Sequence, residues 1–178
     1  MGSDKGMLCS GGKTWAQIAV EKLRLLNIEV FISINSDQIE NYGSHFPKKS
    51  IIIDNKGLAI GGPLRGILST HLIHPEDDLM VLACDMPLMD FSLLSALIKN
   101  AKLRASKMAT LYSRDGEIEP LCTLYTAEGL KRIMGQYEKG KLTRFSMKFI
   151  LGLLDIQVIQ VEREDWNLFS NLNSPEDI

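Results

Sequence analysis

Continuous apolar runs and amphipathic segments alternate along the chain. Short apolar runs predict buried strands over residues 29–35, 50–54 and 78–87, and a further strand is predicted over residues 156–162. Apolar residues at helical spacing predict helices over residues 13–27, 61–74, 91–105, 128–139 and 142–153. Two further strands are predicted over residues 107–116 and 119–126, on either side of a turn at Gly116.

This alternation is typical of an α/β fold. Strands that are apolar along their whole length belong to parallel sheets that helices cover on both faces. We therefore expect a doubly wound, mostly parallel sheet. The sequence contains no repeat, low-complexity tract or linker, so residues 1–178 are expected to form a single domain.

Composition narrows the classes of function. The net charge of −2 gives no broad basic surface, so we expect neither nucleic acid nor a membrane surface as a partner. No apolar run approaches the roughly 18 residues that a membrane span needs. The three cysteines, Cys9, Cys84 and Cys122, match no zinc or disulfide pattern, which favours a cytoplasmic location.

Polar residues follow three of the predicted strands. They are Asn35, Asp54 and Asp85. In doubly wound sheets ligands bind beyond the carboxyl ends of the strands, so three polar side chains at one such edge indicate a binding site. The alternative for each residue is turn chemistry, because Asn and Asp are common where loops begin.

Asp85 is the strongest single candidate for a functional residue. It closes the apolar run of "VLACDMP", and Pro87 ends the strand. Carboxylate oxygens are the ligands that Mg²⁺ prefers, and Mg²⁺ commonly bridges them to substrate phosphates. We expect Asp85 to be a metal ligand, with a helix N-cap as the alternative.

Two glycine-containing stretches are candidates for phosphate or base contacts. In "GSDKG", Lys5 can reach a phosphate while the neighbouring glycines let backbone N–H groups approach it. The alternative is a solvated lysine on a flexible end. The stretch "GGPLRG" over 61–66 enters a helix, where a base or phosphate could lie against bare backbone. Its alternative is tight packing of helix against sheet.

The chain closes on "NLNSPEDI". Asn173 or Ser174 can cap a short helix with Pro175 in its first turn. Capping does not account for Asn171, which lies two residues earlier on the same side of an extended chain. The two asparagine amides could therefore face one ligand or metal.

Taken together, "MGSDKGML", "IIIDN", "GGPLRGILS", "VLACDMP" and "NLNSPEDI" resemble the molybdenum cofactor guanylyltransferase (MobA) family, in that family's order and at about its spacing. The resemblance covers essentially the whole chain. It implies a Rossmann-like, GT-A-like nucleotidyltransferase fold with three layers. In the family, a strand and the loop LAGGxSxR come before M-G-x-D-K-G, so we expect such a segment ahead of Met1 in the natural protein.

The resemblance implies a Mg²⁺-dependent enzyme that transfers GMP from GTP to molybdopterin and releases pyrophosphate. GTP and the molybdopterin cofactor would be its substrates. Apoproteins of molybdoenzymes or cofactor chaperones would be further partners. By position, Lys5 resembles the phosphate-loop lysine and Asp85 the magnesium ligand of the family.

Further positions correspond to the family's nucleotide and pterin contacts. Asp54 resembles the acidic residue that helps bind the guanine nucleotide, and Gly62 a glycine near the nucleotide. Asn171 and Asn173 resemble an Asn-x-Asn pair near the metal and the pterin.

The match for one family asparagine is divided between two residues. This asparagine follows the family's second strand. Its likeliest aligned position holds Ser33, and Asn35 lies two residues beyond. Both residues are therefore candidates for nucleotide binding.

Two other functions remain open at this point. A sister enzyme on the same fold could use CTP with the same pterin, or a sugar or alcohol phosphate as acceptor. Asp54 favours GTP, because a carboxylate suits the N1–H and amino edge of guanine. A non-catalytic nucleotide-binding adaptor is a further alternative, although such a protein would not need Lys5, Asp85 and the asparagine pair.

Overall fold

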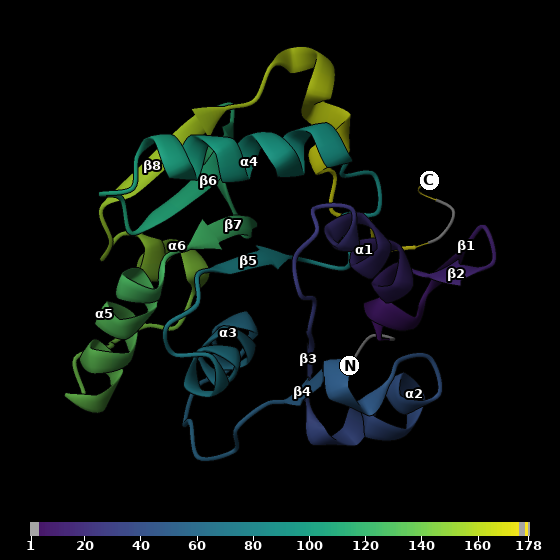
Figure 1. The fold of residues 1–178 in the computed structure, drawn as a ribbon, viewed down its shortest axis with the longest axis horizontal. Coiled ribbons are helices and arrows are strands. Elements are labelled where there is room, and N and C mark those ends of the chain that lie inside the picture. The colour runs from purple at the N-terminus through teal and green to yellow at the C-terminus, as the bar shows by residue number, and fades with distance from the viewer. Residues whose placement is uncertain (1–3, 175–176, 178) are drawn as a thin grey trace.

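The computed structural model describes residues 4–174 and 177, and it has the α/β architecture that the sequence predicts (Figure 1). The main strands form two sheets. In one sheet β3 (Ile32–Ile34) and β4 (Ile51–Ile53) pair in parallel. The other has the order β5-β7-β6-β8, with the bounds Leu79–Leu82, Glu117–Tyr125, Ala109–Arg114 and Ile156–Gln160. The short strands β1 (Cys9–Ser10) and β2 (Lys13–Thr14) form an antiparallel ribbon.

Helices lie on both sides of the four-stranded sheet, with α4 on one side and α3 and α5 on the other (Figure 1). The α-helices α1 to α6 span Trp15–Arg24, Ile39–Gly43, Pro63–Ile73, Phe91–Leu103, Ala127–Glu138 and Met147–Leu151. Short 3₁₀ helices span Lys5–Met7, Ser36–Gln38, Lys48–Ser50 and Arg163–Phe169. In the described part of the chain no helix is long and apolar enough to cross a membrane.

Alternating residues of the sheet build two separate cores. Leu111 of β6 packs with α3, α5 and α6, whereas its neighbour Tyr112 packs with α4 and Phe169. On β7, Tyr125 belongs to the first core and Leu124 to the second. Successive strand residues point to opposite faces, so this division confirms the doubly wound arrangement with three layers.

The sheet contains antiparallel as well as parallel pairs. β6 pairs in parallel with β8, but β7 runs antiparallel to both β5 and β6. The direction of β7 follows from its two-residue link to β6. Asp115 and Gly116 have φ of 51° and 81°, the left-handed pair that a tight hairpin turn requires. The predicted turn at Gly116 is confirmed.

Some predicted boundaries are wrong. The pattern over 142–153 predicts a longer helix than α6, because Leu142 and Met147 reach the same core without a continuous helix between them. α1 begins only at Trp15, since Lys13 and Thr14 pair with β1. Its first turn is fixed by a capping box, in which Thr14 and Gln17 each accept a bond from the other's backbone N–H.

The predicted burial of three strands is also wrong. In β4, Ile53 is exposed. β3 contains the exposed Ser33, and all four residues of β5 are only half-buried. Among the described strands, β3 pairs with β4 alone and β5 with β7 alone. The other edge of each strand borders a cavity of about 610 Å³ that lies between them. One edge of each of these two strands therefore faces the cavity and not another described strand.

Candidate active site

Lys5 and Asp85 form an ion pair at the carboxyl end of β5. Lys5 Nζ donates to Asp85 Oδ2 over 2.9 Å. The side chains are 38% and 21% exposed, so both can still be reached from solvent. The backbone carbonyl of Asp85 accepts a bond of 2.9 Å from Leu172 N–H, which ties the C-terminal segment to the same point.

Hydrogen bonds of Asp4 fix the turn that carries Lys5, which argues against the alternative of a lysine on a flexible end. Asp4 caps it by accepting from Gly6 N–H over 3.0 Å. The same carboxylate accepts from the hydroxyl of Tyr42 over 3.1 Å and from the amide of Gln38 over 2.5 Å. A Cβ on Gly6 would lie 2.1 Å from the Tyr42 hydroxyl oxygen, so only glycine fits here. Burial, then Asp4, raises the pKa of Tyr42, which keeps its hydroxyl a donor.

Asp85 is not a helix cap. The N-cap of α4 is Asp90, whose Oδ1 accepts from Leu93 N–H over 3.0 Å. The capping alternative for Asp85 is therefore wrong. By contrast, Asn35 does what turn chemistry predicts, because its side chain accepts from Asp37 N–H over 2.9 Å.

Ser33 and Asp54 form a second polar pair, at the ends of β3 and β4. Ser33 Oγ donates to Asp54 Oδ1 over 2.6 Å. α3 passes close by: a Cβ on Gly66 would lie 2.6 Å from Ser33 Oγ and 3.4 Å from Asp54 Oδ1. Gly66 therefore serves the tight packing that was the alternative for the 61–66 stretch. Gly62, with φ of 68°, precedes α3 in a conformation that favours glycine.

The C-terminal asparagines flank the residue bound to Asp85. Leu172 is buried, whereas Asn171 and Asn173 on either side of it are exposed. This alternation leaves both amides accessible, as the predicted pair requires. The backbone N–H groups of Asn173 and Ser174 both donate to Asp177 Oδ2 over 2.9 Å. Pro175, the predicted first residue of a helix, lies outside the described residues.

Glu119 is a site residue that the sequence analysis missed. The β6–β7 register shifts here, so that Tyr112 pairs with Glu119 and Leu111 with Thr123. Such a bulge re-aims side chains, and Pro120 was its signal in the sequence, since proline is rare inside paired strands. Glu119 Oε2 accepts from Asn171 Nδ2 over 3.4 Å. Burial raises the pKa of Glu119, and the nearby Asp85 adds to that rise.

A divalent cation fits this site only with help from a substrate. Asp85 offers carboxylate oxygens of the type that Mg²⁺ prefers. However, no cluster of three or more His, Cys, Asp or Glu side chains within 4–174 and 177 could hold a metal ion. Mg²⁺ usually keeps several waters and binds one or two carboxylates plus phosphates, and Asp85 suits that arrangement.

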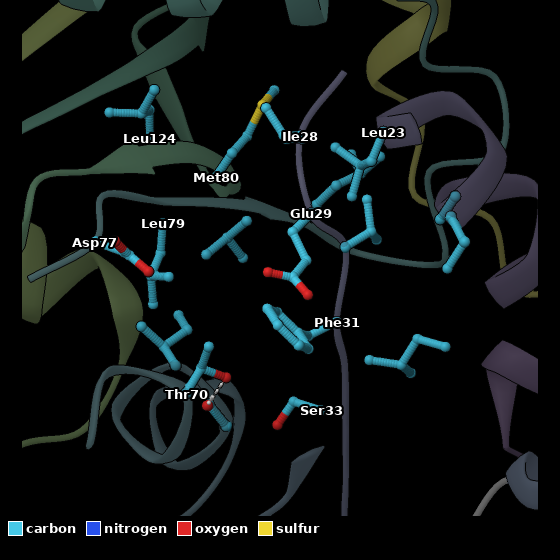
Figure 2. Close-up of a pocket in the computed structure, with 18 of the residues that line it drawn as sticks. Leu23, Ile28, Glu29, Phe31, Ser33, Thr70, Asp77, Leu79, Met80 and Leu124 are labelled. Carbon is cyan, nitrogen blue, oxygen red and sulfur yellow. Dashed lines mark hydrogen bonds between the residues drawn. The ribbon is translucent and has the colours of Figure 1, made fainter. Parts of the chain in front are cut away.

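A cavity of about 610 Å³ lies beside these polar pairs, and its lining is mostly apolar where the pairs are polar. Figure 2 shows Phe31 and Ser33 on its β3 side, Leu79 and Met80 on its β5 side, and Thr70 of α3. At its carboxyl end it is bordered by Ser33 of one pair and by Cys84, next to Asp85 of the other. Most of its lining is apolar, which does not suit nucleotide phosphates.

The chain is similar to a known domain family and to several named enzymes. The sequence profile of the MobA-like NTP transferase domain matches residues 1–149. The molybdenum cofactor guanylyltransferase of Pseudomonas entomophila is 26% identical, over 98% of this chain and 87% of that protein. The enzyme of the same name from Ectopseudomonas mendocina is 30% identical, over 98% of this chain and 81% of that protein.

A solved structure has the same fold. It is molybdopterin-guanine dinucleotide biosynthesis protein A from Archaeoglobus fulgidus, with a TM-score of 0.77 and 21% identity. The match covers 99% of this chain and 87% of that one. The fold alone does not identify the family, but the profile match and the sequence relatives do. The chain belongs to the MobA-like NTP transferase domain family, and it is a nucleotidyltransferase.

Proposed function

We propose that this nucleotidyltransferase moves GMP from GTP to molybdopterin and releases pyrophosphate, with Mg²⁺ as cofactor. Two sequence relatives that align with nearly the whole chain are named molybdenum cofactor guanylyltransferases. The observation that carries the proposal is the Lys5–Asp85 pair, which sets an ammonium and a carboxylate side by side at the carboxyl end of a strand. A phosphate-bound metal and a phosphate-binding cation are needed at the same point in nucleotidyl transfer.

Nucleotidyl transfer requires the protein to position the reacting phosphates and to balance their charge more than to take part in covalent steps. The acceptor phosphate must lie in line with the α-phosphorus, and negative charge on the phosphate oxygens must be balanced. Lys5 is held by its capped turn within 2.9 Å of Asp85, so its ammonium is placed to bind a phosphate oxygen. No protein nucleophile is required by this reaction.

Asp85 would hold the magnesium ion by its carboxylate, and the exposed amides of Asn171 and Asn173 lie on the segment bonded to Asp85. When bound, Mg²⁺ would supply Lewis-acid stabilisation of the phosphate oxygens. The two asparagines are assigned to the metal and pterin side of the site. Their part is to orient the acceptor through amide hydrogen bonds.

The Ser33–Asp54 pair is assigned to the nucleotide base. The Ser33 hydroxyl already donates to one oxygen of Asp54, which leaves the other oxygen for a ligand. An ionised carboxylate accepts hydrogen bonds from the N1–H and amino groups of guanine. Cytosine has no matching pair of donors, so the pair supports GTP over CTP. Gly62 has no side chain, so a nucleotide could approach its backbone nearby. The Asn35 side chain is used in capping its own turn, so we do not assign Asn35 to the base.

The product would pass to apoproteins of molybdoenzymes or to cofactor chaperones, and we place the enzyme in the cytoplasm. The unpaired state of Cys9, Cys84 and Cys122 supports a reducing compartment.

The proposal is tested by measuring pyrophosphate release with Mg²⁺, molybdopterin and one nucleotide at a time. We expect release with GTP that depends on molybdopterin. Release with CTP alone would assign the chain to a cytidylyltransferase instead. Release with GTP that needs a sugar or alcohol phosphate in place of molybdopterin would overturn the acceptor. Nucleotide binding without release under any of these conditions would indicate an adaptor.

A further inference from the structure

The segment that follows β3 contacts the turn that carries Lys5. It consists of the 3₁₀ turn Ser36–Gln38 and the helix α2. Two of its side chains, Gln38 and Tyr42, donate hydrogen bonds to the carboxylate of Asp4, the residue before Lys5. Because 34 and 38 residues separate Asp4 from these two donors, tertiary packing and not local sequence brings them together.

Gln38 uses both ends of its side-chain amide. Its Oε1 accepts from Asn35 N–H over 3.0 Å, and its Nε2 donates to Asp4 Oδ2 over 2.5 Å. The first bond is half of a capping box with Asn35, a motif that takes either glutamate or glutamine. The second bond requires glutamine, because an ionised glutamate has no proton to donate. Glutamine at this position therefore serves the contact with Asp4 as well as the cap.

Tyr42 holds the other oxygen of the same carboxylate. It is 5% exposed, and its ring stacks on that of Phe46 in the core that includes residues of α1. Its hydroxyl donates to Asp4 Oδ1 over 3.1 Å, and this oxygen also accepts from Gly6 N–H over 3.0 Å. Both oxygens of Asp4 are thus bonded to the segment that follows β3. The turn that Asp4 caps is therefore fixed relative to the end of β3.

These bonds connect the two polar pairs of the site. The pairs are Ser33–Asp54 at the ends of β3 and β4, and Lys5–Asp85 at the end of β5. Between them the connection consists of a short backbone step, two hydrogen bonds and a second short backbone step. Its members in order are Ser33, Asn35, Gln38, Asp4 and Lys5. A shift of the end of β3 would therefore act on the Lys5 turn.

We propose that Gln38 and Tyr42 are positioning residues that couple recognition of the nucleotide base to the placement of Lys5. A base bound at the end of β3 would fix that end. The bonds to Asp4 would then hold the Lys5 ammonium where a phosphate oxygen lies. The inference rests on the proposed function, because it takes the polar pair of β3 and β4 as the base contact and Lys5 as the phosphate contact.

Coupling of this kind makes the choice of base affect the reaction as well as binding. A nucleotide whose base fits Ser33 and Asp54 would hold the end of β3, and part of its binding energy would be used to place Lys5. A nucleotide whose base does not fit would leave the Lys5 turn less constrained. Base preference would then appear in kcat as well as in KM.

Gln38→Glu separates the contact with Asp4 from the cap. Glutamate still accepts from Asn35 N–H, but it removes the donor and sets a second carboxylate against Asp4. Calorimetry with GTP and with guanosine, both in Mg²⁺, measures the share of affinity that comes from the phosphates. The Kd for GTP should rise by about tenfold or more, since hydrogen bonds to charged groups are among the stronger ones. The Kd for guanosine, which has no phosphate, should change little.

Three further variants separate positioning from charge and from folding, all with circular dichroism that matches the parent protein. Asn41→Asp makes the same amide-to-carboxylate change at an exposed position of α2, so it should leave the Kd for GTP near the parental value. Tyr42→Phe removes only the hydroxyl that bonds to Asp4, and it should weaken GTP binding as Gln38→Glu does. In a Lys5→Ala background, Gln38→Glu should cause no further loss, because a residue that acts through Lys5 then has nothing to position.

An equal loss of GTP affinity in Gln38→Glu and Asn41→Asp would overturn the coupling, as would a loss that persists undiminished in the Lys5→Ala background. A parallel loss for GTP and guanosine would also overturn it, because it would indicate a structural role only. GTP binding by the parent protein without molybdopterin-dependent pyrophosphate release would overturn the proposed function, and the same Kd values would still decide the coupling. A parent protein that binds no GTP would overturn both.

Discussion

Lys5 Nζ and Asp85 Oδ2 lie 2.9 Å apart although 80 residues separate them in the chain. The contact brings the N-terminal turn onto the carboxyl end of β5. The Leu172 N–H bonded to the Asp85 carbonyl adds the C-terminal segment. Three distant parts of the sequence therefore meet at one residue, Asp85, and the proposed chemistry depends on that meeting.

Lys5→Ala should reduce turnover far more than stability. The ion pair is partly exposed, so its loss should cost less than about 1 kcal/mol of unfolding free energy. Loss of one preorganised charge should lower kcat by about 100-fold. Thermal unfolding and pyrophosphate release measure the two effects. Lys13→Ala is the control, because Lys13 also forms an ion pair, with Glu21, but on the exposed surface of α1. Similar kcat values for both variants would remove Lys5 from the site.

Asp54→Asn should weaken GTP selectivity. Replacing the carboxylate removes the paired acceptor for guanine, and hydrogen bonds to a charged group are worth about 1.5–3 kcal/mol. The ratio of kcat/KM for GTP to that for CTP should therefore fall by about tenfold or more. Asn35→Ser is the control, since serine caps a turn as well as asparagine does. An unchanged ratio in Asp54→Asn would place base recognition elsewhere.

Glu119→Gln should stabilise the fold in a pH-dependent way. Burial raises the pKa of Glu119 in the folded state, so stability from the protonated carboxyl is fully present below the unfolded pKa. That stability is lost as the pH rises through the folded pKa. Glutamine keeps the shape without ionising. The Tm difference between Glu119→Gln and the parent protein should be larger at pH 7 than at pH 4, and a constant difference would contradict the argument.

The sequence predicted those features that depend on local pattern. Asp85 and Asp54 could be found because they end apolar runs, and strand ends meet at one sheet edge. The choice between Ser33 and Asn35 could not be made, because it depends on which side chain reaches Asp54 across two strands. Glu119 escaped notice because a register shift places it, and such shifts come from pairing. The half-buried state of β5 likewise depends on pairing, because among the described strands β5 pairs with β7 alone.

Asp85→Asn tests the central claim most directly. Asparagine keeps the shape of Asp85 but removes the charge that pairs with Lys5 and would bind Mg²⁺. Asp90→Asn is the matched control, because Asp90 caps α4 and asparagine caps about equally well. The measurement is Mg²⁺-dependent pyrophosphate release with GTP and molybdopterin, on variants whose circular dichroism matches the parent protein. The account predicts a loss of about 100-fold or more in Asp85→Asn and near-parental release in Asp90→Asn. Near-parental release by a folded Asp85→Asn would contradict it.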